Sequence, residues 1–245
     1  MSLDFRTYCI IGDPIDHSLS PAIHNAAFSS LGLNCSYIAF RVQEGQLKNS
    51  LDSLRAINIG GFNVTMPHKV RVLEYVDQCD KTVELVGAAN TVNNEDGKFC
   101  AYNTDVLGFI KPLRQRGIDF NGFEVTILGA GGAARAVAVA LASEKGIANI
   151  NIFNRNNDRS KELANMLKKL GLKASIVPSD NIQNIASKSN LIINTTPLGM
   201  KDEQSLIKSS SIRKDAIVYD IVYKPINTSL LENARTAGAK VVYGY

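Results

Sequence analysis

The sequence contains few residues of the kinds that bind metals or form disulfides, and it spaces them widely. Its four cysteines are scattered without a C-x-x-C pair, and its three histidines form no metal-binding motif. Neither a disulfide framework nor a metal site is therefore expected. We expect reduced thiols and a cytoplasmic location, since free cysteines persist in a reducing compartment.

Long apolar runs and blocks of one charge are also missing. No run approaches the ~20 apolar residues that cross a bilayer. Residues 1–13 lack the basic and then apolar segments of a secretion signal. The net charge is only +4 and includes no long basic run, which argues against a general nucleic-acid-binding protein. We expect a small-molecule partner, no nucleic acid and no membrane, with one local anion site.

Short β-branched runs alternate with helical patterns along the 245 residues, which indicates a parallel α/β architecture. Apolar side chains make up 45% of the chain, enough for the cores of one large or two ordinary domains. We expect a seam between two halves near residues 104–107. The expected strands are residues 7–12, 35–42, 59–65, 124–129, 149–154, 173–177, 191–196 and 216–223, with a hairpin at 89–104 that turns at Asp96-Gly97. The expected helices are residues 20–32, 46–58, 68–76, 104–117, 130–146 and 158–171.

A glycine-rich loop joins an expected strand to an expected helix in the second half. In "ILGAGGAARAV", Gly129, Gly131 and Ala134 fit the pattern G-x-G-x-x-G/A. The first glycine permits a tight turn, the second lets a pyrophosphate approach the backbone, and the alanine lets the helix pack closely on the sheet. An ordinary tight turn is the alternative. The strand before the loop, the helix after it and the next strand at the proper distance favour a dinucleotide site.

The stretch "NRNNDR" (residues 154–159) carries positive charge where a dinucleotide site usually has an acid. NAD-binding proteins place an acidic residue here, at the end of the second strand, to bind the ribose 2′-hydroxyl. Arg155 and Arg159 would instead attract a 2′-phosphate, and Asn154 can bond the sugar. The acid Asp158 weakens this interpretation slightly, although it could equally cap the following helix. The alternative is a solvated loop of surface arginines. The position favours NADP(H) as the cofactor.

Three polar clusters in the first half lie at expected strand ends or helix starts. They are "HSLSP" (17–21), "NVTMPHK" (63–69), and "AANTVN" together with "YNTD" (88–93 and 102–105). Each combines hydroxyl or amide groups with an occasional charge. A small polyhydroxy acid would need donors for its carboxylate and acceptors for its hydroxyls, so these clusters are candidate substrate-binding segments.

Several segments spread in order across nearly the whole chain are specific as a set. They read "GDPIDHSLSPAIHNAAF", "GFNVTMPHK", "GAANTV", "NTDVLGF", "GAGGAARAV", "NR" followed by Arg159, "NTTPLGM" and "YDIVYKP". With them the sequence closely resembles the shikimate dehydrogenase family. The resemblance implies two α/β domains. A substrate-binding three-layer sandwich would span residues 1–104, with residues 226–245 packing back on it, and a Rossmann-type NADP-binding domain would span 105–225.

The resemblance also implies an activity and roles for individual residues. The activity is reversible reduction of 3-dehydroshikimate to shikimate with NADPH, in the pathway to chorismate and the aromatic amino acids. Lys69 and Asp105 match the family's catalytic pair, Ser18 and Ser20 match the positions that bind the substrate carboxylate, and Thr195 and Ile221 match the nicotinamide side. The full set of matched substrate-binding positions is Ser18, Ser20, Asn63, Thr65, Lys69, Asn90, Asp105 and Tyr223. The matched cofactor-binding positions are Gly129, Ala130, Gly131, Gly132, Ala133, Asn154, Arg155, Arg159, Thr195, Ile221 and Gly244.

The implied reaction explains why a lysine and an aspartate are needed. Oxidation of a secondary alcohol moves a hydride to the nicotinamide and a proton to a base. Lys69 could bond the reacting oxygen, shuttle that proton and, as a cation, stabilise the alkoxide that develops during reduction, while Asp105 orients it. Without the family, Lys69 would be interpreted as a surface lysine in a first helical turn, and Asp105 and Ser20 as helix caps. Likewise Asn63 and Asn90 could satisfy backbone groups of buried turns, and Tyr223 could be a core residue; the histidines His17 and His68 are expected to be structural.

The chain departs from the family pattern at "GAKVVYGY", its last residues. Family members continue with a glycine-rich turn and a closing helix that carry a substrate-binding glutamine and a methionine near the nicotinamide, and neither has an equivalent here. Two other functions therefore stay open: a quinate/shikimate dehydrogenase that uses either cofactor, and a truncated, non-catalytic NADP-binding paralogue. The family contains monomers and homodimers, so we expect one of these two states.

Overall fold

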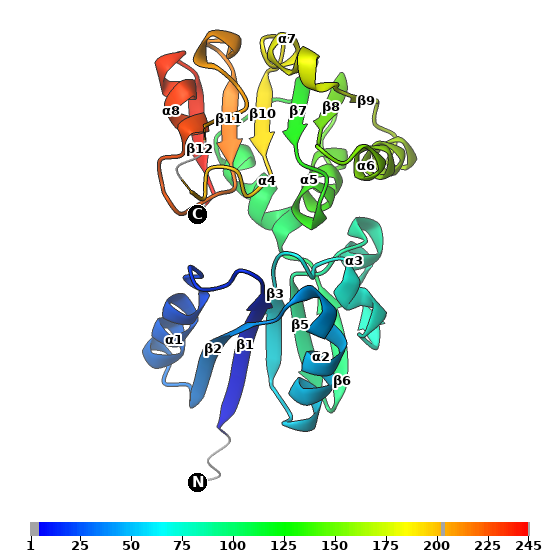
Figure 1. Ribbon diagram of the computed structural model, residues 1–245, viewed down its shortest axis with the longest axis vertical. Coiled ribbons are helices and arrows are strands. Elements are labelled where there is room, and N and C mark those ends of the chain that lie inside the picture. The colour runs from blue at the N-terminus through cyan, green and yellow to red at the C-terminus, as the bar shows by residue number, and fades with distance from the viewer. Residues whose placement is uncertain (1–4, 202–203, 245) are drawn as a thin grey trace. The chain divides into compact units, whose positions relative to one another are not determined.

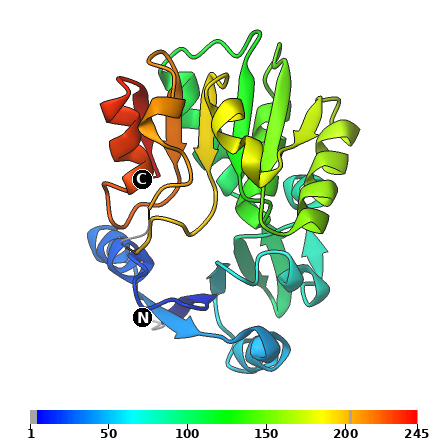
Figure 2. The same ribbon diagram turned by 45° about the horizontal axis from the view of Figure 1, so that its top comes forward.

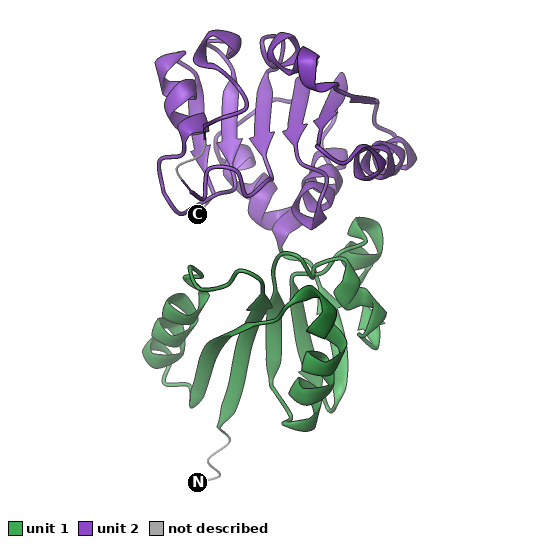
Figure 3. Cartoon of the chain, in the orientation of Figure 1, with its two compact units in different colours: residues 1–104 green, residues 105–245 purple. Residues whose placement is uncertain are grey.

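The structure is a computed structural model that describes residues 5–201 and 204–244. The chain divides after Thr104 into two compact units (Figures 1 and 3). Among the described residues each unit contains one six-stranded sheet flanked by helices. The expected α/β fold class is therefore confirmed.

The sheet of the first unit is mixed. Its strands are β1 (Arg6–Gly12), β2 (Cys35–Arg41), β3 (Gly61–Val64), β4 (Gln78–Cys79), β5 (Thr91–Glu95) and β6 (Lys98–Tyr102), in the order β2-β1-β3-β5-β6-β4. β1 pairs in parallel with β2 and β3, and β3 pairs antiparallel with β5. The expected hairpin is present: Asp96 and Gly97 connect β5 to β6 with φ angles of 52° and 86°, the left-handed conformation that a tight hairpin turn requires.

Helices cover both faces of this sheet. Successive side chains of β1 point to opposite sides, so its apolar residues need a covering helix on each face. The buried leucines of α2 (Leu47–Ala56) pack with Ile11 on one side. Ile10 belongs to a second cluster, on which Phe28 of α1 (Ser20–Ser30) packs. The first unit thus has the three layers, helix, sheet and helix, that the resemblance implied.

Residues 68–76 do not form the helix that their apolar spacing predicted. Only a short 3₁₀ helix, Arg71–Glu74, follows a run of turns. The Thr65 N–H donates to the Ile11 carbonyl (3.0 Å), and the Ala89 N–H donates to the Lys69 carbonyl (2.8 Å). These bonds hold residues 65–69 as a turn, so Lys69 lies on a turn and not in a first helical turn.

One short helix of the first unit was not expected from the sequence. α3 (Lys81–Val86) begins at Asp80, whose side chain accepts a 2.7 Å hydrogen bond from the Val83 N–H. It ends at Gly87 in the left-handed conformation (φ 63°), the usual role of glycine after a helix. The apolar residues Val83 and Val86 are buried.

The sheet of the second unit is parallel throughout. Its strands are β7 (Glu124–Leu128), β8 (Asn149–Phe153), β9 (Ala174–Ile176), β10 (Leu191–Asn194), β11 (Ile217–Asp220) and β12 (Lys240–Tyr243), in the order β12-β11-β10-β7-β8-β9. The chain runs outward from β7 in one direction and then returns to β10 on the other side. This is the strand order of a doubly wound Rossmann sheet, and ligands bind such sheets at the carboxyl ends where the order reverses.

Helices cover both faces of this second sheet (Figures 1 and 2), and their side chains form two apolar cores with it. One contains buried side chains of α4 (Asp105–Gln115), α5 (Gly132–Ala142) and α6 (Asn157–Lys169). The other contains side chains of α7 (Ile182–Ala186) and α8 (Ser229–Thr236). Within the described ranges of either unit, no helix is long and apolar enough to cross a membrane.

The segment after residue 225 adds a helix and an edge strand to the second sheet. β12 pairs in parallel with β11, from Lys240 opposite Ile217 to Tyr243 opposite Asp220, and α8 packs into the apolar core of the second unit. Residues 226–244 thus belong to the second unit, Tyr245 lies outside the described residues, and the expectation that residues 226–245 pack back on the first domain stays a prediction. The side chains Leu230, Leu231 and Ala234 explain the placement, because they are buried against this sheet.

Candidate functional site

The glycine loop lies at the carboxyl end of β7, where the strand order reverses. Gly129 has a φ of +110° and donates its N–H to the Phe153 carbonyl at 2.7 Å. A Cβ at this position would overlap the Thr195 hydroxyl, which itself donates to the Leu128 carbonyl at 2.7 Å. Both the backbone conformation and the contact with Thr195 therefore require glycine at position 129.

Gly131 lies in a different environment from Gly129. It is the N-cap of α5, it is exposed, and no described atom outside the neighbouring stretch of chain lies within 4 Å of the point where a Cβ would stand. Ala134 is fully buried against the sheet, and Ala130 and Ala133 complete the loop. The exposed N-terminus of α5 leaves backbone N–H groups and open space for a phosphate group to approach.

The segment after β8 carries the two arginines predicted to contact the cofactor, Arg155 in the loop and Arg159 in α6. Arg155 and Arg159 are exposed, and Asn154 donates to the Asn156 carbonyl at 2.8 Å. The expected helix cap is corrected: Asn156, not Asp158, caps α6, since its side chain accepts from the N–H groups of residues 158 (3.0 Å) and 159 (3.1 Å). A cap three residues before Arg159 places that arginine in the first turn of α6.

A surface pocket adjoins this loop. Asn154 and Arg155 are among the residues that line it, together with Val177, Pro178 and Ser179, which follow β9. Arg159 is not among the lining residues. The pocket combines an amide, a guanidinium and a hydroxyl group, which is a suitable donor set for a sugar phosphate.

The remaining predicted cofactor residues follow the next three strands of the same sheet. Thr195 follows β10, and Ile221 follows β11 and donates its N–H to the Asn194 carbonyl at 3.1 Å. Gly244 follows β12, and a Cβ there would overlap the Ile221 backbone. Tyr223, predicted to contact the substrate, is 39% exposed and belongs to this second unit. The carboxyl ends of the strands thus gather these residues at one edge of the sheet.

A buried polar network behind these loops was missed in the sequence. It consists of Asn194, Asp220 and Thr228, whose exposed fractions are 3%, 0% and 1%. Asp220 accepts hydrogen bonds from the Asn194 side chain (2.9 Å), the Val222 N–H (3.0 Å) and the Thr228 hydroxyl (2.7 Å). Burial raises the pKa of Asp220, and these three donors oppose the rise. A polar residue ending each of two apolar strands was the signal that could have identified the network.

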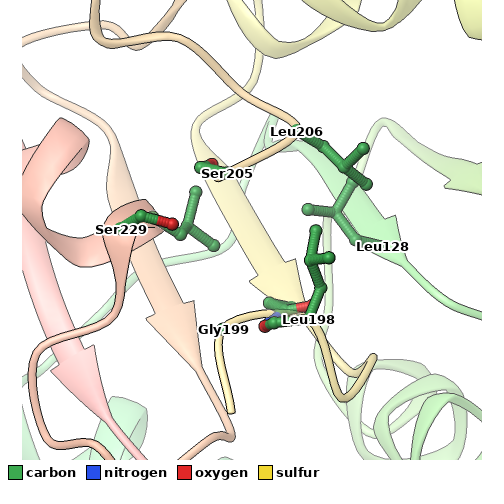
Figure 4. Close-up of a pocket in the computed structure, with 8 residues that line it drawn as sticks. Leu128, Leu198, Gly199, Ser205, Leu206 and Ser229 are labelled. Atoms are coloured by element: carbon green, nitrogen blue, oxygen red, sulfur yellow. The ribbon is translucent and has the colours of Figure 1, made fainter. Parts of the chain in front are cut away.

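A small cavity lies beside the network (Figure 4). Leu198, Gly199, Ser205 and Ser229 are among the residues that line it. Its volume of about 10 Å³ is close to that of a single water molecule. It therefore has no room for a cofactor or a substrate.

In the first unit, Asn63 is the centre of a set of hydrogen bonds. Its Nδ2 donates to the Asn90 carbonyl (3.2 Å) and to the Thr91 hydroxyl (3.1 Å), and its Oδ1 accepts from the Tyr37 hydroxyl (2.6 Å). These partners fix the amide orientation, because a carbonyl can receive only the nitrogen side. What Asn63 retains for a ligand is acceptor capacity on Oδ1.

Tyr37 joins this set to the serines at the start of α1, and the sequence did not indicate it. Its ring stacks on His24 with centroids 4.2 Å apart, and burial raises the pKa of its hydroxyl. The Ser20 side chain hydrogen-bonds the same hydroxyl. Ser18 accepts a 3.2 Å bond from the Ser20 N–H, so Ser20 is the first residue of α1 and does not cap it through its own side chain. The structure therefore brings Ser18, Ser20 and Asn63 together.

The turn that carries Lys69 is anchored by its neighbours. The His68 N–H donates to the Thr65 carbonyl (2.9 Å), and the His68 side chain is fully buried, with Nε2 2.6 Å from the Val42 carbonyl. The Lys69 carbonyl accepts from Ala89, and Lys69 itself is half-buried. The expectation that His68 is structural fits this burial.

Asn90 fixes the segment that leads to Asp105. Its side chain donates to the Thr104 hydroxyl (2.8 Å) and accepts from the Thr104 N–H (3.0 Å). Asp105 follows as the first residue of α4 and is half-buried. Lys69 belongs to the first unit and Asp105 opens the second, so their action as a pair stays a prediction.

In the part of the chain that the structure describes, no group of three or more histidine, cysteine, aspartate or glutamate side chains could hold a metal ion.

The fold and the loops define a class of protein. A doubly wound sheet with a glycine loop at its reversal point and an arginine-bearing loop after the next strand is a Rossmann-type dinucleotide-binding unit, here joined to a separate α/β unit. Two-domain dehydrogenases that use nicotinamide cofactors are built in this way.

Comparison with known proteins identifies the family within this class. Residues 10–92 match the shikimate dehydrogenase substrate binding domain, and residues 113–222 match the shikimate / quinate 5-dehydrogenase family. The NADP(+) shikimate dehydrogenase of Nitrosopumilus maritimus is 43% identical over 98% of this chain and 88% of its own length. That of Methanopyrus kandleri is 44% identical over 100% of this chain and 87% of its own length.

A solved structure agrees with these matches. Shikimate 5-dehydrogenase from Thermus thermophilus in complex with NADP(H) and shikimate is 34% identical, with a TM-score of 0.83 over 98% of this chain and 87% of that one. The chain therefore belongs to the shikimate dehydrogenase family, as the sequence motifs predicted.

Proposed function

We propose that this protein is an NADP-dependent shikimate dehydrogenase that reversibly reduces 3-dehydroshikimate to shikimate. The observation that carries the proposal is family membership over nearly the whole chain, at 43% identity to an NADP(+) shikimate dehydrogenase. The residues expected to bind the two ligands support it, since each unit carries its set on strands, helix starts and the turns that join them. The domain roles belong to the proposal: residues 1–104 bind the substrate and residues 105–225 bind NADP(H).

The residues of the second unit fit the phosphates of NADP(H). The open space at Gly131 and the N-terminus of α5 suit the pyrophosphate. Arg155, in the pocket wall, and Arg159, in the first turn of α6, suit the 2′-phosphate that distinguishes NADP from NAD. An arginine would gain nothing comparable from the 2′-hydroxyl of NAD, so these residues favour NADP(H).

The residues of the first unit fit a small polyhydroxy acid. Ser18 and Ser20 offer hydroxyl groups to the carboxylate. Asn63 has committed its Nδ2 to Asn90 and Thr91, so it would accept a hydrogen bond from a ring hydroxyl and would not bind the carboxylate. Thr65, Asn90 and, from the second unit, Tyr223 complete the proposed contacts with the ring.

Lys69 and Asp105 are the proposed catalytic residues. When bound, the cofactor supplies the hydride for reduction or accepts it in oxidation. Lys69 would hydrogen-bond the reacting oxygen, stabilise the developing alkoxide as a cation and deliver the proton that completes reduction. Asp105 would orient the Lys69 ammonium and accept a hydrogen bond from a neighbouring substrate hydroxyl.

The surroundings of the enzyme are part of the same proposal. All four cysteines are free, which is typical of proteins in a reducing compartment, and we infer a cytoplasmic location. We propose a monomer or a homodimer, to be separated by sedimentation of the purified chain.

A steady-state assay of the purified chain tests the proposal. Shikimate and quinate are each offered with NADP and with NAD, and reduction of the cofactor is followed at 340 nm. We expect shikimate with NADP to give the highest kcat/KM. Equal rates with quinate and NAD would favour the dual quinate/shikimate enzyme, and the shikimate / quinate match over residues 113–222 is the observation in its favour.

A binding measurement separates the non-catalytic alternative. NADPH binding is titrated by fluorescence in the unmodified chain and in Lys69→Ala. We expect turnover in the first, none measurable in the second, and the same NADPH affinity in both. Binding without turnover in the unmodified chain would instead make it a non-catalytic NADP-binding protein.

A further inference from the structure

The buried network of Asn194, Asp220 and Thr228 joins three segments that diverge beyond the strands. Asn194 ends β10, Asp220 ends β11, and Thr228 is the N-cap of α8. The network therefore lies directly behind the loops that carry Thr195 on one side and Ile221 and Tyr223 on the other.

The hydrogen bonds assign one orientation to every group in the network. Asn194 Oδ1 accepts hydrogen bonds from the Thr196 N–H (3.1 Å) and hydroxyl (2.6 Å). Its Nδ2 donates to the Leu198 carbonyl (3.0 Å) and to the Asp220 carboxylate (2.9 Å). Asn194 thus holds residues 196–198 on one side and Asp220 on the other. A single amide fixes the course of the loop after β10.

Asp220 does the same for the loop after β11. Its Oδ1 accepts from the Val222 N–H (3.0 Å) as well as from Asn194, and its Oδ2 accepts from the Thr228 hydroxyl (2.7 Å). The Thr228 oxygen also accepts from the Leu231 N–H (3.3 Å), so its proton is directed at Asp220. Each partner of the carboxylate is a donor, and the side chain is fully buried.

We propose that Asp220, with Asn194 and Thr228, is a positioning residue that sets the loops on the nicotinamide side of the site. The role rests on the proposed function, because Thr195, Ile221 and Tyr223 are assigned to nicotinamide and substrate by that function. The network touches neither ligand in this assignment. It fixes the chain at residues 196, 198 and 222, which are next to or close to Thr195, Ile221 and Tyr223 in the sequence.

The role predicts that losing the network slows hydride transfer more than it weakens cofactor binding. The proposed phosphate contacts lie on other segments, at Gly131 and Arg155, and the network does not hold them. A displaced nicotinamide pocket changes the approach of the reacting atoms, to which rates are steeply sensitive. We therefore expect kcat to fall while the NADPH affinity is retained.

Three variants test the proposal in the full chain. Thr228→Val keeps the volume and removes the hydroxyl, Thr228→Ser keeps the hydroxyl, and Asp220→Asn replaces Oδ2 by an amide donor. We expect Thr228→Val and Asp220→Asn each to lower kcat about tenfold and to change the Kd for NADPH less than about threefold. Thr228→Ser should restore kcat to within about twofold.

The double variant distinguishes the network from simple helix capping. Thr228→Val also removes the cap of α8, and lost capping would lower kcat by the same factor whether residue 220 is aspartate or asparagine. A network that acts as a unit makes Asp220→Asn with Thr228→Val no worse than either single change. Additive losses would therefore overturn the positioning role.

The remaining outcomes are also decisive. Variants that lower the melting temperature but keep kcat, measured well below that temperature, would show that the network only stabilises the fold, and would overturn the proposal. If the unmodified chain oxidises no shikimate with NADP, the proposed function fails and this role fails with it. An active chain with unaffected variants overturns the positioning role alone.

Discussion

Tyr37 donates a 2.6 Å hydrogen bond from its hydroxyl to Oδ1 of Asn63, across strand β1 of the first sheet. Residue 37 is in β2 and residue 63 in β3, with β1 between them. The bond links an unremarked tyrosine to a residue that we propose contacts the substrate ring. It makes Asn63 a group whose donors and acceptors are almost all assigned before a ligand arrives.

Replacing Tyr37 by phenylalanine should weaken substrate binding selectively. The change removes the donor to Asn63 Oδ1 and the partner of Ser20. We expect KM for shikimate to rise severalfold with an unchanged KM for NADP, and the free energy of unfolding to fall by about 1 kcal/mol. Burial raises the pKa of Tyr37, so its hydroxyl remains a donor throughout the neutral and mildly alkaline range and the effect should not vary with pH there.

Tyr8→Phe is the matched control for this change. The Tyr8 ring packs against Phe28 (5.6 Å between centroids) on the same face of the sheet, and Asn63 is hydrogen-bonded to Tyr37 and not to Tyr8. Steady-state kinetics of both variants should separate them. If Tyr37→Phe and Tyr8→Phe raise KM for shikimate by the same factor, the bond from the Tyr37 hydroxyl to Asn63 has no specific role in substrate binding.

The arginines after β8 should set the preference for NADP. Arg155→Ala and Arg159→Ala are each expected to raise KM for NADP about tenfold, the equivalent of one charge-assisted hydrogen bond of about 1.5 kcal/mol. KM for NAD should hardly change, because NAD has no 2′-phosphate. Arg213→Ala is the control, since Arg213 is a comparable arginine in the same unit that pairs with Asp215 at 2.9 Å.

Initial rates with both cofactors provide the comparison. If Arg155→Ala weakens NADP and NAD by the same factor, the guanidinium acts on a group that both share, and the assignment to the 2′-phosphate is wrong. If neither arginine matters, residues 154–159 are a solvated surface loop.

The parts of the fold predicted from the sequence are those that local patterns determine. β7, β8 and β10 are short apolar runs bounded by turn residues, and the hairpin turn at Asp96-Gly97 has its own signature. The glycine loop was located because each position of its motif has a local physical reason. The family motifs then supplied the expected site residues, and the structure shows how Ser18, Ser20 and Asn63 are connected.

The parts that were missed depend on contacts between distant segments. The apolar spacing of residues 68–76 fits a helix, but the Ala89 N–H engages the Lys69 carbonyl and holds a turn instead. The bond between Tyr37 and Asn63 depends on sheet register, and β12 belongs to the second sheet only because Lys240 to Tyr243 pair with β11. No pattern within a short window contains these pairings.

Two cysteines should differ sharply in their reactivity. Cys9 is fully buried, and burial raises its pKa to about 12. Cys79 is exposed. Its pKa is also raised, mainly because part of the thiol's surroundings is protein and, to a smaller extent, because the carboxylates of Glu84 and Asp80 are near. Only the thiolate is alkylated, so at about pH 8 iodoacetamide should modify Cys79 slowly and Cys9 not at all, and Cys79 should react faster as the pH rises.

Peptide mass spectrometry measures this difference. Cys79→Ser should remove the adduct from that peptide, and unfolding in urea should make Cys9 reactive. Modification of Cys9 in the native protein would contradict its burial between β1 and the helices of the first unit.

Gly129 and Gly131 are two residues apart, but substitution by alanine should lower the free energy of unfolding strongly at position 129 and hardly at position 131. Alanine at position 129 must adopt a φ of +110° and overlaps the Thr195 hydroxyl. We expect Gly129→Ala to lower the free energy of unfolding by about 3 kcal/mol through backbone strain and overpacking. At Gly131 the φ is −91° and the space is open, so Gly131→Ala should change stability by less than about 1 kcal/mol.

Gly131→Ala, which we expect to fold stably, should nevertheless bind NADPH more weakly than the unmodified chain. The methyl group of Gly131→Ala occupies the space through which the pyrophosphate is proposed to approach the backbone, and one methyl group in a close-fitting site costs about tenfold or more in affinity. Urea denaturation and NADPH fluorescence titration measure the two effects separately. A Gly131→Ala variant that binds NADPH normally would show that the phosphates bind elsewhere on the sheet edge.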